Sequence, residues 1–490
     1  MPVDTRPVED RRTEAIEALR AFATPPDWLA AVADPATVAS VLSRQVPELA
    51  SGELSLRRCD VRRVQIKKHA LPALYRLEVA DGDGRPARTV DLRGELVPPG
   101  LPEPDAVTAD APLGSAAWRC WVPELRLDLA TGPAGDAALP ALDLLRDAEK
   151  VRALLEHAIR AGSPHYADLR IEACSPRVAR YQPGSRCTIV YRLRFPPEAA
   201  SQSWPELLVA KTHRDDRGRT AYEGMQALWR SELRRAGNVT IAEPLAFLPD
   251  LKVLVQAGIP HECTLSELLR SSLGAGTTKP MDDLVAYLAK TARGLADLHA
   301  CRTLPPEVVT WEDELAEVRA VVARLGALIP ELTGAATPLL VRLEALAREH
   351  PADPLRPAHR SFRPAQVLLR GGAIGFIDFD GFCRAEPAID VALFRAIVKD
   401  IGLKALQAKE GTAADGRPRP EHLTLLDELC EGFTLHYEAF ARVSRWRVAL
   451  WEALDLLTLV LHSWTKLKFD RLGPRLGLLH HHLRVSGLDG

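Results

Sequence analysis

The sequence of 490 residues has a single asparagine, Asn238, and no Cys-x-x-Cys pair. Its eight scattered cysteines therefore indicate neither a zinc site nor a dithiol redox motif. The amino terminus lacks the apolar core of a signal peptide. The most apolar helical stretch, Val448 to His462, is interrupted by Glu452 and Asp455 and is too short to span a bilayer. We expect a cytoplasmic protein with reduced thiols and no membrane partner.

The sequence also has no large excess of charge of either sign. The net charge is −2 and no stretch is strongly basic, so we expect no nucleic-acid partner. With 47% hydrophobic and 26% charged residues, the composition is that of an ordinary globular protein. The length predicts two or three domains. The dominance of Arg, Ala and Leu is typical of a GC-rich bacterium, and the oligomeric state stays open.

The order of elements can be predicted coarsely. Residues 8–49 have apolar residues at helical spacing, interrupted by Pro25-Pro26, and strands are predicted from Leu54. A second strand region is predicted over residues 169–257, and the end of the chain is helical. Tyr75-Arg-Leu77 in the first strand region is echoed by Tyr191-Arg-Leu193 in the second. Either the first region is a degenerate copy of the second, or two β-meanders are alike by chance.

One segment carries most of the chemistry. It begins with the loop His359-Arg-Ser-Phe-Arg-Pro-Ala-Gln366 and ends with Ile377-Asp-Phe-Asp380. Between them, an apolar run followed by Gly371-Gly372 predicts a tight hairpin, because glycine allows the positive φ angles of a two-residue turn. The hairpin would return Asp378 to the side of the loop. A carboxylate that holds a metal, beside a loop that orients a hydroxyl, is the layout that phosphoryl transfer needs.

These residues resemble the aminoglycoside phosphotransferase and choline kinase family of protein-kinase-like enzymes. The family pattern is H-G-D-x-x-x-x-N, a short hairpin and I-D-W/F. His359 matches its histidine, Asp378 falls on its metal-binding Asp, and Asp390 falls on the buried Asp that follows.

The resemblance implies an α+β, protein-kinase-like bilobal fold, in which a small antiparallel β-sheet lobe is joined to a larger helical lobe. We expect an N-terminal α+β domain over residues 1–145, the small lobe over 146–257 and the helical lobe over 258–490. The resemblance further implies ATP and Mg²⁺ as cofactors. The partners would be the nucleotide and a small-molecule acceptor whose identity the sequence does not give.

Two positions depart from the family pattern. Ser361 stands in place of the catalytic Asp, and a hydroxyl has no useful basicity near neutral pH. Gln366 stands in place of a metal-binding Asn, as in maltokinase-like relatives, and its amide oxygen is equivalent. We expect Asp378 and Gln366 to hold the metal, and Ser361, His359 and Asp380 to form the catalytic group. Asp380 is alternatively a solvated turn carboxylate.

The resemblance also assigns the nucleotide contacts. Lys211 ends an apolar run, as the phosphate-pairing lysine on the third strand of a kinase does. Its alternative is a solvated residue at a strand end. Glu223 or Glu232, in the helix that follows, would form an ion pair with Lys211, and we favour Glu223 because it comes earlier. Backbone groups of Gln256 and Ala257, in the hinge strand, would meet the adenine edge.

Three functions remain open at this point. The protein is an ATP-dependent phosphotransferase acting on a hydroxyl of a small molecule, with activity weakened or lost by Ser361. Alternatively it is a pseudokinase that binds nucleotide and serves as a regulatory or scaffold module, or the site is purely structural. Arg360, which replaces the family's glycine, favours the latter two. Arg360 and Arg363 could alternatively clamp an anion.

Overall fold

The computed structural model describes residues 22, 25–67, 70–81, 86–104, 111–131, 136, 138–199, 201–274, 281–412 and 417–488. The chain divides into two compact units, each assembled from separate segments. The first consists of residues 1–134, 312–348 and 453–490, and the second of residues 135–311 and 349–452. The division at residues 145 and 257 stays a prediction.

The first unit contains a five-stranded antiparallel sheet in the order β1-β2-β3-β5-β4. Its strands are β1 (Leu54–Val64), β2 (Pro72–Asp81), β3 (Arg88–Leu96), β4 (Arg119–Val122) and β5 (Leu127–Thr131). Alternate residues of β2, from Ala73 to Val79, are buried, as a strand with one face on a core requires. Tyr75 on this face donates its hydroxyl hydrogen bond to the carbonyl of Val32.

Helices complete the first unit. They are α2 (Asp27–Ala31), α3 (Pro35–Gln45), α4 (Pro47–Ala50), α11 (Trp311–Gly326), α12 (Pro330–Glu349), α15 (Arg445–Thr465) and α16 (Leu472–Val485), of which α11, α12 and α15 each run partly into the second unit. Asp34 caps α3 by accepting from the backbone N–H of Thr37. The helices predicted over residues 8–49 are confirmed from Asp27 onward, whereas residues 8–21 lie outside the described residues.

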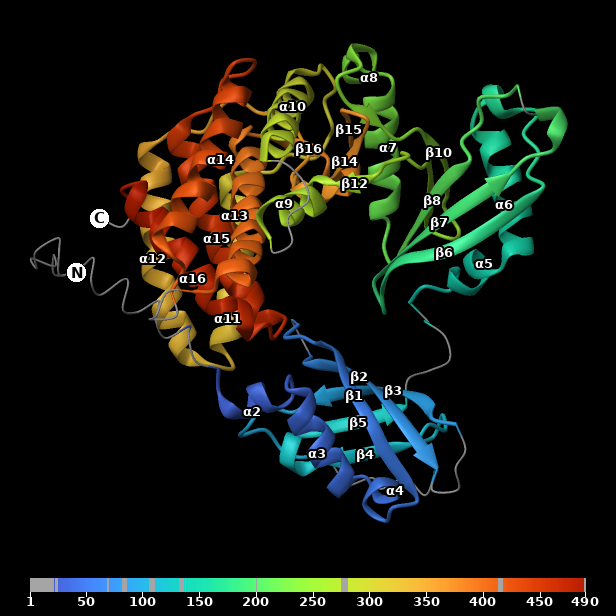
Figure 1. The fold of residues 1–490 in the computed structure, drawn as a ribbon, viewed down its shortest axis with the longest axis vertical. Helices are drawn as coiled ribbons and strands as arrows, with labels where there is room; N and C mark the ends of the chain where they lie inside the picture. The colour runs from blue at the N-terminus through green and yellow to red at the C-terminus, as the bar shows by residue number, and fades with distance from the viewer. Residues whose placement is uncertain are drawn as a thin grey trace, which may run out of the picture. The chain divides into compact units, whose positions relative to one another are not determined.

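The second unit begins with its own five-stranded antiparallel sheet, in the order β10-β11-β8-β7-β6 (Figure 1). The strands are β6 (Ala173–Gln182), β7 (Arg186–Arg194), β8 (Leu207–His213), β10 (Pro244–Leu248) and β11 (Val253–Ala257). Helices α5 (Leu142–Arg146) and α6 (Ala148–Gly162) share one hydrophobic core with the sheet. Two further helices, α7 (Arg217–Trp229) and α8 (Glu232–Ala236), follow β8.

The two five-stranded sheets have the same strand order. Numbered from its own first strand, each sheet reads 1-2-3-5-4. The register agrees as well, because Cys59 pairs with Leu77 and Cys174 pairs with Leu193, in each case two residues beyond the shared tyrosine. Tyr191, like Tyr75, bonds a backbone carbonyl, that of Leu145. The two sheets thus share strand order and register, and the copied lobe stays a prediction.

The helical part of the second unit surrounds two small sheets. Its helices are α9 (Leu265–Leu273), α10 (Met281–Ala300), α13 (Ala388–Glu410) and α14 (Pro420–Glu438). One sheet has the order β12-β14-β15-β9, with β12 (Cys263–Thr264), β14 (Val367–Arg370), β15 (Ala373–Phe376) and β9 (Thr240–Ile241). The other pairs β13 (Arg356–Ala358) with β16 (Cys383–Ala385). The expected hairpin is confirmed as β14–β15, with Gly371 and Gly372 both at positive φ.

The fold class is therefore confirmed: the chain is α+β, with a small antiparallel lobe and a helical lobe of protein-kinase-like type. Among the residues that the structure describes, no helix is both long enough and apolar enough to cross a membrane.

Candidate active site

Lys211 lies at the centre of the site. It stands near the end of β8, where its side chain is buried, and its Nζ lies 2.5 Å from Oδ1 of Asp378 and 2.8 Å from Oδ1 of Asp380. Burial alone would lower the pKa of Lys211, but the charges of Asp380 and Asp378 outweigh it and raise the pKa above its ordinary value. The lysine is thus a fixed positive charge rather than a solvated strand end.

Asp378 follows the hairpin, as predicted. It caps the 3-10 helix η6 (Phe379–Gly381) and adopts a left-handed backbone conformation, with φ 73° and ψ 47°. Such a conformation is costly for a non-glycine residue and recurs at functional sites. Burial would raise the pKa of the Asp378 carboxyl, but the charge and hydrogen bond of Lys211 hold it well below its usual range. Asp378 therefore stays ionised.

Asp380 is mostly buried and is not the solvated turn carboxylate of the alternative reading. Besides Lys211, its carboxylate lies 3.7 Å from Nη1 of Arg186 and 3.9 Å from Nε2 of His213. Its Oδ2 is buried and has no hydrogen-bond partner among the described residues. No described contact joins Asp380 to Ser361, so its placement in the catalytic group stays a prediction.

The sequence reasoning missed Arg186 and His213. A signal for each was present. Arg186 is the first residue of β7, directly after the turn that follows β6. His213 is two residues beyond Lys211 on the same strand, so the two side chains share one face. Burial lowers the pKa of His213, and the charge of Lys211 adds to this although Asp380 opposes it.

His359 anchors the loop that faces Asp378. The residue is fully buried, and its backbone N–H donates to Oδ2 of Asp390 at 2.6 Å. Asp390 also lies 3.2 Å from Nε2 of His299, whose Nδ1 contacts the hydroxyl of Tyr437 at 2.7 Å. Asp390 thus ties the loop to α10 directly and to α14 through His299.

Ser361 forms a hydrogen bond with His359. Nε2 of His359 lies 3.0 Å from the carbonyl oxygen of Ile377, which can only accept, so Nε2 carries the proton. Burial lowers the pKa of His359 despite the opposing charge of Asp390, so the ring is neutral and its Nδ1 is an acceptor. The hydroxyl of Ser361, 3.3 Å away, therefore donates to Nδ1.

Gln366 lies between Ser361 and Asp378. Its Nε2 is 3.3 Å from the Ser361 hydroxyl and 3.3 Å from Oδ2 of Asp378. Its Oε1 accepts from the backbone N–H of Arg363 at 3.1 Å. The amide oxygen, which we expected to bind the metal, therefore faces the backbone, and the amide N–H₂ faces the carboxylate.

The expected ion pair between Lys211 and Glu223 is wrong for this structure. Among the described residues, the ion pairs of Lys211 go to Asp378 and Asp380. Helix α7 buries Ala221, Met225 and Leu228, whereas Glu223 lies off this stripe and is exposed. Glu232 lies in α8 and pairs with Arg235.

The hinge strand is present as β11, which pairs with β8. The side chain of Gln256 is buried, and its Oε1 has no hydrogen-bond partner among the described residues. The backbone N–H of Ala257 donates to the carbonyl of Glu243 at 2.9 Å. Contact of that N–H with adenine would require this bond to be exchanged, and the adenine role of both residues stays a prediction.

Arg360 adopts a left-handed conformation, with φ 63°. Glycine adopts this region without steric cost, which explains the glycine of the family pattern. The guanidinium of Arg360 pairs with Glu307 at 2.9 Å, and the side chain of Arg363 donates to the carbonyl of Ser361 at 3.1 Å.

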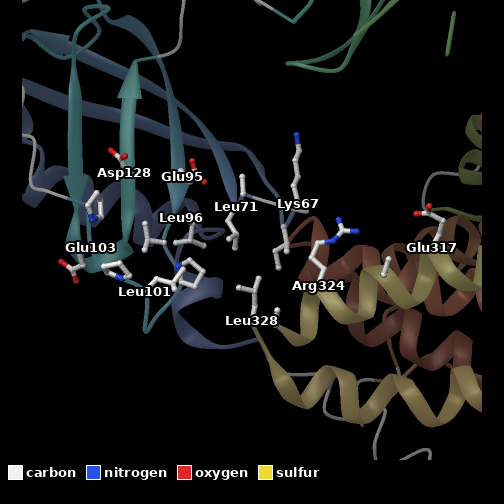
Figure 2. A pocket seen from close by; sticks show the side chains of 18 residues that line it. Lys67, Leu71, Glu95, Leu96, Leu101, Glu103, Asp128, Glu317, Arg324 and Leu328 are labelled. Atoms are coloured by element: carbon white, nitrogen blue, oxygen red, sulfur yellow. The ribbon is translucent and has the colours of Figure 1, made fainter. Parts of the chain in front are cut away.

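A cavity of about 950 Å³ lies elsewhere, within the first unit (Figure 2). Leu71, just before β2, Leu96 at the end of β3 and Leu101 in the segment after β3 line one side. Arg324 of α11 and Leu328 in the turn after it line the other. None of the residues that line it belongs to the site around Lys211.

Part of the chain is similar to known proteins. Residues 193–425 match the profile of the phosphotransferase enzyme family. A search of the curated proteins finds no significant match. The chain is similar to the solved structure of a glucosamine kinase, at 16% identity over 94% of this chain and 99% of that one, with a TM-score of 0.43.

Two further solved structures are similar to about two thirds of the chain. Spectinomycin phosphotransferase APH(9)-Ia, in complex with ADP and spectinomycin, is 11% identical over 70% of this chain and 99% of that chain, with a TM-score of 0.41. An ethanolamine kinase of Plasmodium vivax is 13% identical over 67% and 89%, with a TM-score of 0.41. The region 193–425, which carries Lys211, Asp378 and the loop at His359, belongs to the phosphotransferase enzyme family.

Proposed function

We propose that the protein transfers the terminal phosphoryl group of ATP to a hydroxyl of a small molecule, and does so slowly. The observation that carries the proposal is the meeting of Lys211, from the small lobe, with Asp378, from the hairpin of the helical lobe, at 2.5 Å. A fixed cation beside a fixed carboxylate can bind a phosphate and a metal next to each other. Phosphoryl transfer depends mostly on such positioning and charge neutralisation.

The residues present fit Mg²⁺. Asp378 is ionised, and the side-chain amide of Gln366 lies beside it, with Nε2 3.3 Å from Oδ2 of Asp378. Carboxylate oxygens are the ligands that Mg²⁺ prefers. Asp378 would hold the ion, and Gln366 would join through its oxygen once its amide turns over. Bound Mg²⁺ would neutralise charge on the phosphate oxygens.

Only a weak general base is available to take the proton of the acceptor hydroxyl. Ser361 stands at the position of the family's Asp and donates to Nδ1 of the neutral His359. Ser361 can accept the acceptor's proton while it passes its own proton to His359. Because burial lowers the pKa of His359, its ring is a weak proton acceptor and proton transfer to it is unfavourable. The loose transition state of phosphoryl transfer needs little from a base, so slow turnover remains.

A second function is favoured by Ser361 and Arg360 together. The loop has lost its carboxylate, and its glycine position carries an arginine at φ 63°. A loop that has departed from the family at both positions suits a pseudokinase, which binds nucleotide through Lys211 and Asp378 and serves as a regulatory or scaffold module. This function needs binding without turnover.

One experiment separates the two functions. ADP release would be followed with Mg²⁺-ATP and a panel of acceptors that includes aminoglycosides, amino sugars and amino alcohols. The acceptor classes are those of spectinomycin, glucosamine and ethanolamine, which appear in the names of the similar structures. Acceptor-dependent ADP release that Asp378→Asn abolishes supports the phosphotransferase. Tight nucleotide binding with no release above buffer supports the pseudokinase.

A further inference from the structure

We propose that Asp380 is the positioning partner of Lys211, in the role for which a helix glutamate was expected. The inference rests on the proposed function, because it concerns how the nucleotide-binding lysine is held. It names a different residue, from a different element, for this role.

Helix α7 offers no carboxylate to Lys211. At the face of α7 turned to the site stands Gly224, where an added Cβ would lie 3.1 Å from the ring of Phe382. The ring thus packs directly on the helix backbone at this position. Glu223, the neighbouring carboxylate, is exposed. Phe382 follows η6, so the aromatic residue that fills the helix face and the carboxylate that meets the lysine come from one short segment.

The segment after the hairpin brings two carboxylates to one ammonium. Asp378 and Asp380 are two residues apart, and the left-handed backbone at Asp378 together with the turn of η6 aims both side chains at Nζ of Lys211. The side chain of Asp380 is 16% exposed and that of Asp378 is 26% exposed. Asp380 is therefore the more enclosed partner.

Arg186 and His213 stand on the other side of the Asp380 carboxylate, at 3.7 Å and 3.9 Å. Both distances exceed that of a hydrogen bond, so the Arg186 guanidinium attracts the Asp380 carboxylate by charge alone, whether or not Asp378 is engaged elsewhere. If Asp378 turns to a metal, Lys211 keeps one ion pair. A lysine without any partner would lose its fixed position in a buried site.

The opposite role would be inhibition. In that case Asp380 occupies the place of a phosphate on Lys211 and competes with the nucleotide. The two roles differ in sign, because loss of a positioning partner weakens nucleotide binding and loss of a competitor strengthens it.

The test compares four variants of the full chain by calorimetry with Mg²⁺-ADP. They are Asp380→Asn, Asp380→Glu, Glu223→Gln and Asp250→Asn, the last an exposed carboxylate in the turn between β10 and β11. We expect Asp380→Asn to weaken binding at least about tenfold, because charge-assisted hydrogen bonds are among the stronger ones. Asp380→Glu should restore most of the affinity. Glu223→Gln and Asp250→Asn should stay within about twofold of wild type, as surface substitutions do.

The melting temperature of each ligand-free variant separates positioning from a general loss of structure. A melting temperature near wild type, with affinity lost in Asp380→Asn and rescued in Asp380→Glu, supports the proposal. Unchanged or tighter binding by Asp380→Asn overturns it, as does weaker binding by Glu223→Gln. If Asp380→Asn does not fold, Asp380→Glu and Glu223→Gln still decide on the same criteria. Absence of binding by the wild type would overturn the proposed function itself.

Discussion

The ammonium of Lys211 lies 2.5 Å from the carboxylate of Asp378, although the two residues are 167 positions apart in the sequence. Lys211 belongs to β8, an inner strand of the small-lobe sheet, and Asp378 follows the β14–β15 hairpin of the helical lobe. Their ion pair joins the two lobes of the second unit. The predictions below follow from this pair and from the loop beside it.

Mg²⁺-ATP should stabilise the protein. A ligand that binds only the native state at 100 times its Kd adds about 2.7 kcal/mol to the free energy of unfolding. Thermal unfolding with and without millimolar Mg²⁺-ATP measures the effect. Lys211→Met should abolish most of the shift, and an unmoved melting curve for the wild type would remove the basis of both proposed functions.

Asp378→Asn should remove the dependence of nucleotide affinity on Mg²⁺. The amide keeps the volume of the side chain but loses the charge that a divalent cation needs. The measured quantity is the ratio of ATP affinities with Mg²⁺ and with EDTA. Gln366→Glu, which adds a carboxylate nearby, should keep or raise that ratio. A ratio near wild type in Asp378→Asn would place the metal elsewhere.

Ser361→Asp should raise turnover. General-base terms are worth about 10²–10⁴-fold, and the Arg360 guanidinium, engaged with Glu307, leaves the new carboxylate free to act. Steady-state ADP release with an accepted substrate tests this. Ser361→Asn, of similar volume but without basicity, is the matched control. Equal rates for the two variants would show that the base is not what limits the reaction.

Arg360→Gly should be more stable than Arg360→Ala by about 1 kcal/mol, because only glycine adopts φ 63° without steric cost. Both variants lose the ion pair with Glu307, so the comparison isolates the backbone. Chemical denaturation of the two proteins provides the measurement. If alanine is equally stable, the left-handed conformation at this position stores no strain.

Acid should destabilise the fold through buried His213 and His359. Burial is the main reason that their pKa values are lowered in the folded state, so the unfolded chain, in which a histidine titrates near about 6.5, binds more protons. Their contribution to stability is complete above that pH and is lost as the pH falls below it. Melting temperatures at pH 7.5 and 5.5 should differ less in His213→Asn than in wild type. His261→Asn, an exposed control, should leave the difference unchanged.

The parts of the site that depend on local sequence could be predicted. The hairpin follows from Gly371-Gly372, and the return of Asp378 follows from the hairpin. The strand position of Lys211 follows from the apolar run before it. Each of these needs only the period and turn chemistry of a short segment.

The partner of Lys211 could not be predicted from local sequence, because it depends on which face of α7 meets the lobe. The buried stripe of α7 through Ala221 and Met225 was readable, and it places Glu223 off the contact face. Arg186 and His213 join the site only through the pairing of β6, β7 and β8, which brings distant residues together.

The first unit has a consequence for the order in which the chain folds during synthesis. Its sheet is complete by residue 131, yet the unit also needs residues 312–348 and 453–490, and the backbone N–H of Ile66 bonds the carbonyl of Thr465 at 2.8 Å. A ribosome delivers the amino-terminal segment first, at about 5–20 residues per second. The early sheet must therefore wait tens of seconds for its last helices, while the second unit, inserted between its segments, is still being made. During that time the amino-terminal sheet lacks the helical segments that complete its unit.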